Sequence, residues 1–308
     1  MKKPKRLQKG DTIGIVGPAS LASLDLVDKG AKVLTNMGYK IKIGKSCNHA
    51  WYNFAGNDQL RADDINEMFS NNAINAIICM RGGYGCNRLI DLINFDNIKQ
   101  NPKLFIGYSD ITTLHCAIEK YSNMVTIHGP MLTSNIANNF DDFTKKSFLK
   151  IIEGKGNFLD NPPSEKIKTL IAGTSTGKLI GGNLELITRT LGTNYSLNTN
   201  GKILFLEDIN EYTYKIDRML YHLKHCNIFK NCTGVIIGSL KKCVKEKSCD
   251  FETSELLKLF FKDYKKPVIY NFIAGHCFPT VTVPLGINCM ITANKNNATI
   301  KLLEQAVI

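Results

Sequence analysis

Short apolar segments and amphipathic segments alternate through the first half of this 308-residue chain. Apolar runs of strand length occur at residues 11–19, 39–44, 74–80, 103–106 and 124–128, and apolar residues at helical spacing occur at 24–37, 58–69, 86–93, 111–118 and 141–154. This alternation predicts a parallel sheet covered by helices on both faces. In such a fold, ligands bind beyond the carboxyl ends of the strands.

The second half of the chain predicts a different kind of domain. Strand and helix patterns there are mixed, and 308 residues exceed the usual size of a single core. Residues 156–177 contain two prolines and the run Gly-Thr-Ser-Thr-Gly, which is typical of a linker. We therefore expect an α/β domain over residues 1–155, a linker over 156–177 and a mixed α/β domain over 178–308.

Composition narrows the functional classes. The net charge of +12 comes from lysines spread along the chain, which favours a solvated basic surface, then attraction of acidic small substrates, and nucleic acid last. No apolar run of about 18 residues exists to span a membrane, and the basic N-terminus lacks a signal-peptide core. The ten cysteines are scattered without a C-x-x-C pair. We expect a cytoplasmic protein with reduced thiols, no metal site and no membrane or nucleic-acid partner.

The motif Gly107-Tyr108-Ser109-Asp110 separates an apolar strand pattern from a helix pattern. A serine on a sharp strand-to-helix turn faces the positive end of the helix, and hydrolase nucleophiles often occupy that position. Serine and aspartate are also favoured as helix caps, and caps are far commoner than nucleophiles. Both interpretations remain open on this motif alone.

A glycine-rich motif, Arg81-Gly82-Gly83-Tyr84-Gly85, follows the strand pattern at 74–80, and we call it the glycine loop. Paired glycines let the backbone approach a ligand and turn its N–H groups outward, which suits a phosphate or a developing oxyanion. The motif lacks the Walker ending and the G-x-G-x-x-G pattern. A plain tight turn is the alternative.

An acid and a histidine follow strand patterns in the second half. Glu207 and Asp208 end the apolar run at 202–206, and His276 follows the run at 268–272 and a glycine. A solvated acidic turn and a structural histidine are the alternatives. Together with Ser109, however, Glu207 and His276 supply the residue types of a Ser-His-Glu triad in the order nucleophile, acid, histidine.

Several motifs occur in an order that identifies a family. They are residues 14–18 with Ser20, 81–85, 107–110, 128–131, 181–184, 206–208 with Tyr214 and Asp217-Arg218, Gly275-His276, and Pro284-Leu285-Gly286. With these motifs the chain resembles the LD-carboxypeptidases, which are serine peptidases of the muramoyl-tetrapeptide carboxypeptidase type. The microcin C self-immunity peptidases are relatives within the same family.

The resemblance implies a catalytic triad of Ser109, His276 and Glu207, with an oxyanion hole from the backbone N–H groups of Gly83 and Asp110. It implies Arg81 as a contact for a substrate carboxylate. It also implies a Rossmann-like or flavodoxin-like N-terminal domain, a C-terminal domain that supplies the acid and the histidine, a homodimer, and no cofactor.

The implied reaction is hydrolysis of the bond between the L-centre of a diamino acid (lysine or meso-diaminopimelate) and the terminal D-alanine of murein tetrapeptides, in cell-wall recycling. The alternative is an immunity-type peptidase that cleaves a peptidyl- or aminoacyl-nucleotide amide. Such relatives tend to be longer, with an extended loop near the site, and the short segment between the domains here favours the cell-wall enzyme. A binding protein that kept the fold without catalysis is a third possibility, which the intact serine, glutamate and histidine argue against.

Overall fold

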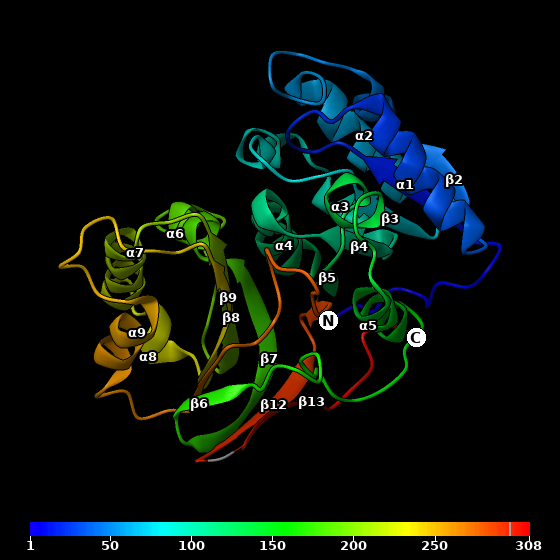
Figure 1. Ribbon diagram of the computed structural model, residues 1–308. Coiled ribbons are helices and arrows are strands. Elements are labelled where there is room, and N and C mark those ends of the chain that lie inside the picture. Colours follow the sequence, from blue (N-terminus) through cyan, green and yellow to red (C-terminus); the bar gives the residue numbers. More distant parts are fainter. Residues whose placement is uncertain (296) are drawn as a thin grey trace. The chain divides into compact units, whose positions relative to one another are not determined.

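The computed structural model describes residues 1–295 and 297–308, and these residues form two compact units (Figure 1). The N-terminal unit contains Met1–Gly156, Thr282–Gly286 and Gln305–Ile308. The C-terminal unit contains Asn157–Val281 and Ile287–Glu304. Each unit combines a β-sheet with helices, which confirms the α/β fold expected from the sequence.

The division differs from the expected one in two places. The segment 156–177, expected as a linker, belongs almost entirely to the C-terminal unit and contains strand β6 (Lys168–Ile171) and the start of β7 (Gly173–Asn183). Its glycines suggested a loop, but the residues between them pair with β12 (Asn288–Asn294) in antiparallel register. The chain also returns to the N-terminal unit near its end, where β11 (Val283–Leu285) pairs with β5 (Thr126–His128).

The sheet of the N-terminal unit has the strand order β11-β5-β4-β3-β1-β2, and all of its pairs except β11 with β5 are parallel. The central strands β3 and β4 are buried along their whole length. Because β1, β3 and β4 are parallel neighbours, their carboxyl ends meet at one edge of the sheet. The remaining strands are β1 (Thr12–Val16), β2 (Lys40–Ile43), β3 (Ala76–Cys79) and β4 (Leu104–Gly107).

Helices connect the parallel strands of this unit. Ile65 of α2 and Leu114 of α4 belong to one buried apolar cluster with the strand residues Ile77 and Phe105. Burial of such helix faces against the sheet supplies most of the stability of these short helices. The helices are α1 (Leu24–Asn36), α2 (Asp58–Ser70), α3 (Phe95–Gln100), α4 (Thr112–Ala117) and α5 (Asp142–Ile152).

The sheet of the C-terminal unit is mixed, with the order β13-β12-β7-β8-β9-β10-β6. Strands β7, β8, β9 and β10 are parallel, and helices α6 to α9 lie on one side of them in Figure 1. The remaining elements are β8 (Lys202–Ile209), β9 (Gly234–Lys241), β10 (Val268–Tyr270), β13 (Asn297–Leu302), α6 (Leu184–Thr190), α7 (Thr213–His225), α8 (Ile228–Asn231) and α9 (Thr253–Phe261).

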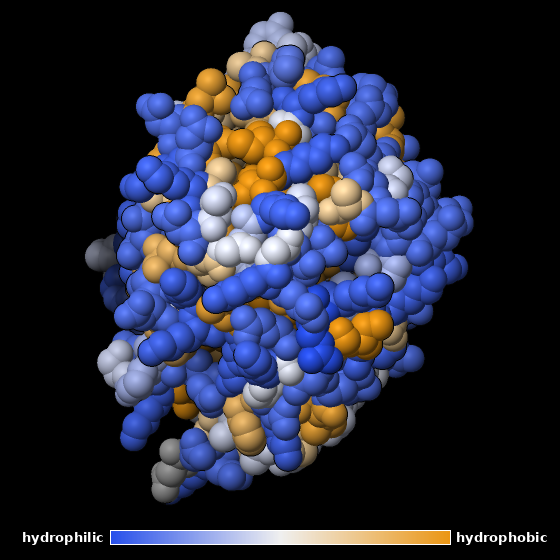
Figure 2. Space-filling model, turned by 90° about the vertical axis from the view of Figure 1, so that its right-hand side faces the viewer, coloured by the Kyte–Doolittle hydropathy of each residue, from blue (hydrophilic) through white to orange (hydrophobic). Residues whose placement is uncertain are grey.

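Hydrophilic side chains predominate on the face of the molecule shown in Figure 2, where hydrophobic side chains form separate patches. All ten cysteines are free thiols, and eight of them are buried. Among the described residues, no helix combines the length and the apolar character that crossing a bilayer requires.

Candidate active site

Ser109 lies two residues after the end of strand β4, at the first residue of the helical segment that follows. Its φ of 66° falls in the left-handed region, which residues other than glycine rarely adopt. The N-cap positions of the two helical segments that follow fall on Tyr108 and Ile111, so Ser109 does not occupy the capping position. A strained serine on a strand-to-helix turn is the backbone geometry of many hydrolase nucleophiles.

The end of β4 is fixed by two hydrogen bonds to one carbonyl. The Nε2–H of His115 and the backbone N–H of Gly129 donate to the oxygen of Gly107 at 2.9 Å and 3.2 Å. Burial lowers the pKa of His115 to about 3, so its ring is neutral near pH 7. His115 therefore holds the strand end in front of Ser109 rather than exchanging protons.

The glycine loop lies against Ser109. A Cβ atom on Gly82 would lie 2.8 Å from the Cβ of Ser109 and 3.0 Å from its Oγ, so glycine is required for this approach. Gly83 has a φ of 112° and lies against Ser20, whose Oγ accepts a hydrogen bond from the N–H of Tyr84 at 3.1 Å. The loop thus brings its backbone into contact with the candidate nucleophile.

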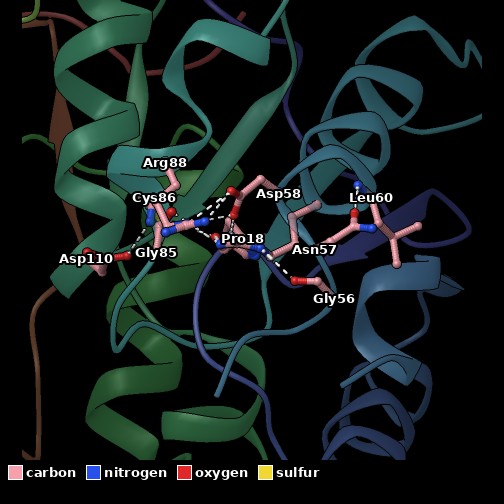
Figure 3. A network of polar contacts seen from close by, with 10 residues as sticks. Pro18, Gly56, Asn57, Asp58, Leu60, Gly85, Cys86, Arg88 and Asp110 are labelled. Carbon is pink, nitrogen blue, oxygen red and sulfur yellow. Dashed lines mark hydrogen bonds and ion pairs between the residues drawn. The ribbon is translucent and has the colours of Figure 1, made fainter. Parts of the chain in front are cut away.

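Asp110 ties the turn at Ser109 to the far end of the glycine loop. Its side chain is 3% exposed and accepts a hydrogen bond from the N–H of Cys86 at 2.8 Å (Figure 3). Arg81, at the start of the loop, is half-buried and donates to the backbone oxygen of Leu21 at 3.3 Å. The N-terminal unit therefore brings the predicted Ser109, Asp110 and Gly83 into one small region.

Glu207 and His276 form a hydrogen-bonded pair within the C-terminal unit. The Glu207 side chain is fully buried at the end of β8, and its Oε2 lies 2.8 Å from the Nδ1 of His276 and 3.2 Å from the backbone nitrogen of His276. The His276 side chain is 14% exposed. With Nδ1–H donated to the carboxylate, the imidazole presents Nε2 as its proton acceptor.

The electrostatics of this pair favour a basic imidazole. Burial lowers the pKa of His276, but the charge and hydrogen bond of Glu207, with a further contribution from the charge of Asp208, outweigh burial and raise it above 6.5. A carboxylate that holds the imidazole in one tautomer and raises its pKa is the arrangement that catalytic triads use.

Asp208 is a second buried carboxylate beside Glu207. It accepts hydrogen bonds from the Nδ2 of Asn183 and from the backbone nitrogens of Glu185 and Ile209, at 2.8 to 3.0 Å. Burial, followed by the charge of Glu207, raises the pKa of Asp208 from 3.8 to about 7. Because the folded pKa is raised, the resulting stabilisation is present below pH 3.8 and is lost as the pH rises through about 7.

Gly275 gives the first test of this arrangement. Its φ is 108°, and a Cβ atom there would overlap the carboxylate of Glu207. We expect Gly275→Ala to lower the free energy of unfolding by at least about 2 kcal/mol and the catalytic rate by about a hundredfold, because the acid is pushed off the imidazole. Thermal unfolding and steady-state rates measure the two effects.

Gly192→Ala is the matched control for that substitution. Gly192 also has a positive φ, 77°, and lies in the same unit, but a Cβ atom there would meet nothing within 4 Å. It should show the backbone strain of about 1 kcal/mol without loss of rate. Equal rate losses in the two variants would contradict the role given to Gly275.

For some residues of the site, the sequence pattern alone gave little indication of a functional role. Asn183 and Ser20 entered only as parts of the family motifs, although both contact site residues directly. Glu207 pairs with His276 across 69 residues of sequence, a contact that no spacing rule gives. The structure places Ser109 with the glycine loop in one unit and Glu207 with His276 in the other.

Two family models match the chain. They describe the LD-carboxypeptidase N-terminal domain, over residues 13–129, and the LD-carboxypeptidase C-terminal domain, over residues 176–291. A probable murein peptide carboxypeptidase of Bacillus subtilis is 37% identical to the chain, and the match covers 97% of this chain and 94% of that protein.

Solved structures with the same fold include two kinds of protein. The microcin C7 self-immunity protein MccF, in complex with aspartyl sulfamoyl adenosine, is 26% identical with a TM-score of 0.92 and full coverage of both chains. A muramoyltetrapeptide carboxypeptidase from Oxalobacter formigenes is 25% identical with a TM-score of 0.85, and the match covers 96% of this chain and 99% of that one.

Proposed function

Because the chain belongs to the LD-carboxypeptidase family, we propose that it is a serine carboxypeptidase of murein tetrapeptides. The bond cleaved would join the L-centre of the diamino acid, lysine or meso-diaminopimelate, to the terminal D-alanine. The observation that carries the proposal is Ser109, held at a φ of 66° on a strand-to-helix turn against a glycine loop. The hydrogen bond between Glu207 and His276, at 2.8 Å, supports the proposal that His276 acts as the base.

The proposed reaction has two steps. Ser109 Oγ attacks the carbonyl carbon of the diamino acid while the Nε2 of His276 takes the hydroxyl proton. The carbon–nitrogen bond then breaks, His276 returns the proton to the leaving D-alanine amine, and an acyl-enzyme remains. Water, deprotonated by His276, hydrolyses the acyl-enzyme and regenerates Ser109.

The remaining predicted residues have supporting roles in this reaction. The backbone N–H groups of Gly83 and Asp110 would bind the oxyanion of each tetrahedral intermediate, a contribution typically worth a factor of about a hundred to a thousand for each donor. Arg81 would contact a substrate carboxylate. The excess of basic residues suits a substrate with several carboxylates.

The raised pKa of His276 predicts the pH dependence. His276 must be neutral to accept the serine proton, so kcat/KM should fall on acidification as the ring is protonated. Because Glu207 and Asp208 raise the pKa, the half-maximal pH on the acid side should lie above 6.5. A pH–rate profile measures this midpoint, and a value below 6.5 would contradict the electrostatic account of the pair.

Product release from defined peptides tests the proposed substrate. A muramoyl tetrapeptide ending in D-alanine should lose that residue without added metal or cofactor, while the same peptide ending in L-alanine should not. Mass spectrometry identifies the bond that is cut. Cleavage at another bond, or equal cleavage of both peptides, would exclude the proposed specificity.

The immunity-type activity is the second candidate, because the MccF complex with aspartyl sulfamoyl adenosine has the same fold as this chain. Aspartyl sulfamoyl adenosine and the tetrapeptide, assayed side by side, distinguish the two activities by their kcat/KM values. We also propose that the protein acts in the cytoplasm as a homodimer, as the family resemblance implies, and light scattering at several concentrations tests the dimer.

A further inference from the structure

We propose that Arg61 is a positioning residue that holds the glycine loop in the geometry needed for oxyanion binding, an inference that rests on the function proposed above. Arg61 lies in α2 and is 0% exposed. A buried guanidinium is costly unless its N–H groups are paired. The partners of Arg61 therefore show which parts of the chain it holds in place.

The guanidinium of Arg61 joins three separate chain segments, which contain Pro18, Gly56 and Gly85. Figure 3 labels these three residues. Its Nε donates to the oxygen of Gly56 at 3.1 Å, and its Nη1 donates to the oxygens of Pro18 and Gly85 at 2.7 Å and 3.2 Å. Its Nη2 is paired with the carboxylate of Asp58. A single nitrogen thus links the end of the glycine loop to the segment after β1.

That segment also holds the glycine loop through two hydrogen bonds of Ser20, which we call the Ser20 clamp. The backbone N–H of Ser20, two residues after Pro18, donates to the oxygen of Gly82 at 3.4 Å. The Oγ of Ser20 accepts from the N–H of Tyr84 at 3.1 Å. Gly83, which carries the proposed oxyanion donor, lies between these two bonds. Arg61 therefore holds the glycine loop in two ways: directly through Gly85, and indirectly through Pro18, which positions the Ser20 clamp.

The loop needs such a clamp because of its composition. Gly83 and Gly85 have φ angles of 112° and 135°, and glycine has more backbone freedom than any other residue. An oxyanion donor stabilises the transition state only if it is already aimed at the oxygen. Lysine at position 61 has one ammonium and cannot reproduce the planar fork that reaches three carbonyls and a carboxylate.

The experiment compares Arg61→Lys with the wild-type protein at the level of single active sites. Completed labelling by a fluorophosphonate counts the competent sites, so misfolded protein does not enter the rates. We expect kcat per labelled site to fall about a hundredfold, while KM changes less than about threefold and the half-maximal pH is unchanged. The rate of labelling should fall together with kcat.

Arg88→Gln is the matched control. Arg88 also binds Asp58, at 2.7 to 3.0 Å, but among the described contacts its 40% exposed side chain donates to the carbonyl of neither Pro18 nor Gly85. It should keep the wild-type kcat. A kcat within threefold of wild type in Arg61→Lys, or an equal loss in Arg88→Gln, would overturn the proposal.

Ser20→Ala keeps the test decisive if Arg61→Lys does not fold. Removal of the Oγ releases the N–H of Tyr84 and should lower kcat per labelled site about tenfold, with KM near the wild-type value. An unchanged kcat in Ser20→Ala would overturn the proposal that the Ser20 clamp positions the glycine loop. If the wild-type protein neither releases D-alanine nor is labelled at Ser109, the proposed function fails first, and this inference fails with it.

Discussion

Replacement of Ser109 with alanine should abolish hydrolysis and leave the protein folded. We expect kcat/KM for D-alanine release to fall by about six orders of magnitude, as expected when the nucleophile of a triad is removed. Alanine at a φ of 66° carries the same backbone strain as serine, so the melting temperature should change little. Both quantities can be measured on one preparation.

Ser122→Ala is the control for the loss of a serine hydroxyl. The Oγ of Ser122 donates to the backbone oxygen of Phe95 at 2.7 Å, in the same unit as Ser109. Its removal should cost about 1 kcal/mol of stability and no activity. Residual activity within tenfold of wild type in a folded Ser109→Ala variant would exclude Ser109 as the nucleophile.

Glu207→Gln should lower kcat by about four orders of magnitude without changing the shape of the site. Glutamine is nearly isosteric, but it lacks the charge that holds Nδ1–H and stabilises the imidazolium formed in the transition state. Glu207 also supplies the largest contribution that raises the pKa of His276. The acid-side half-maximal pH of the residual activity should therefore move downward.

Glu67→Gln provides the comparison for that variant. Glu67 pairs with Lys42 at 2.6 Å, and both side chains are substantially exposed, so its loss should change neither kcat nor the pH profile. If Glu207→Gln keeps its kcat and its pH midpoint, the carboxylate does not act on His276, and the triad would be wrong in that member.

The arrangement of the N-terminal unit follows from the sequence more directly than that of the C-terminal unit. Short apolar strands separated by amphipathic helices leave few alternatives to a parallel sheet, and Ser109 and the glycine loop fall at the carboxyl ends of adjacent strands β4 and β3. The strands at residues 168–183 were harder to predict. Their own sequence is rich in glycine, and they form strands by pairing with β12 and β10, which lie far along the chain.

The long-range polar contacts could not be predicted from the sequence. Nothing in the pattern around Arg61 distinguishes it from a solvated helical arginine, yet its partners Pro18 and Gly85 lie 43 and 24 residues away. The pairing of Glu207 with His276 likewise joins the end of β8 to the segment after β10, which only the folded unit brings together. Local patterns fix elements, whereas such contacts depend on the order of the strands.

A crystal structure of the wild-type protein bound covalently to a phosphonate analogue of the tetrapeptide tests the central claim most directly. We expect a bond from phosphorus to Ser109 Oγ, the phosphoryl oxygen within about 3 Å of the backbone nitrogens of Gly83 and Asp110, and the Nε2 of His276 within about 3 Å of Ser109 Oγ. Phosphorus bound to another residue, or an adduct whose Ser109 Oγ lies far from His276, would contradict the account.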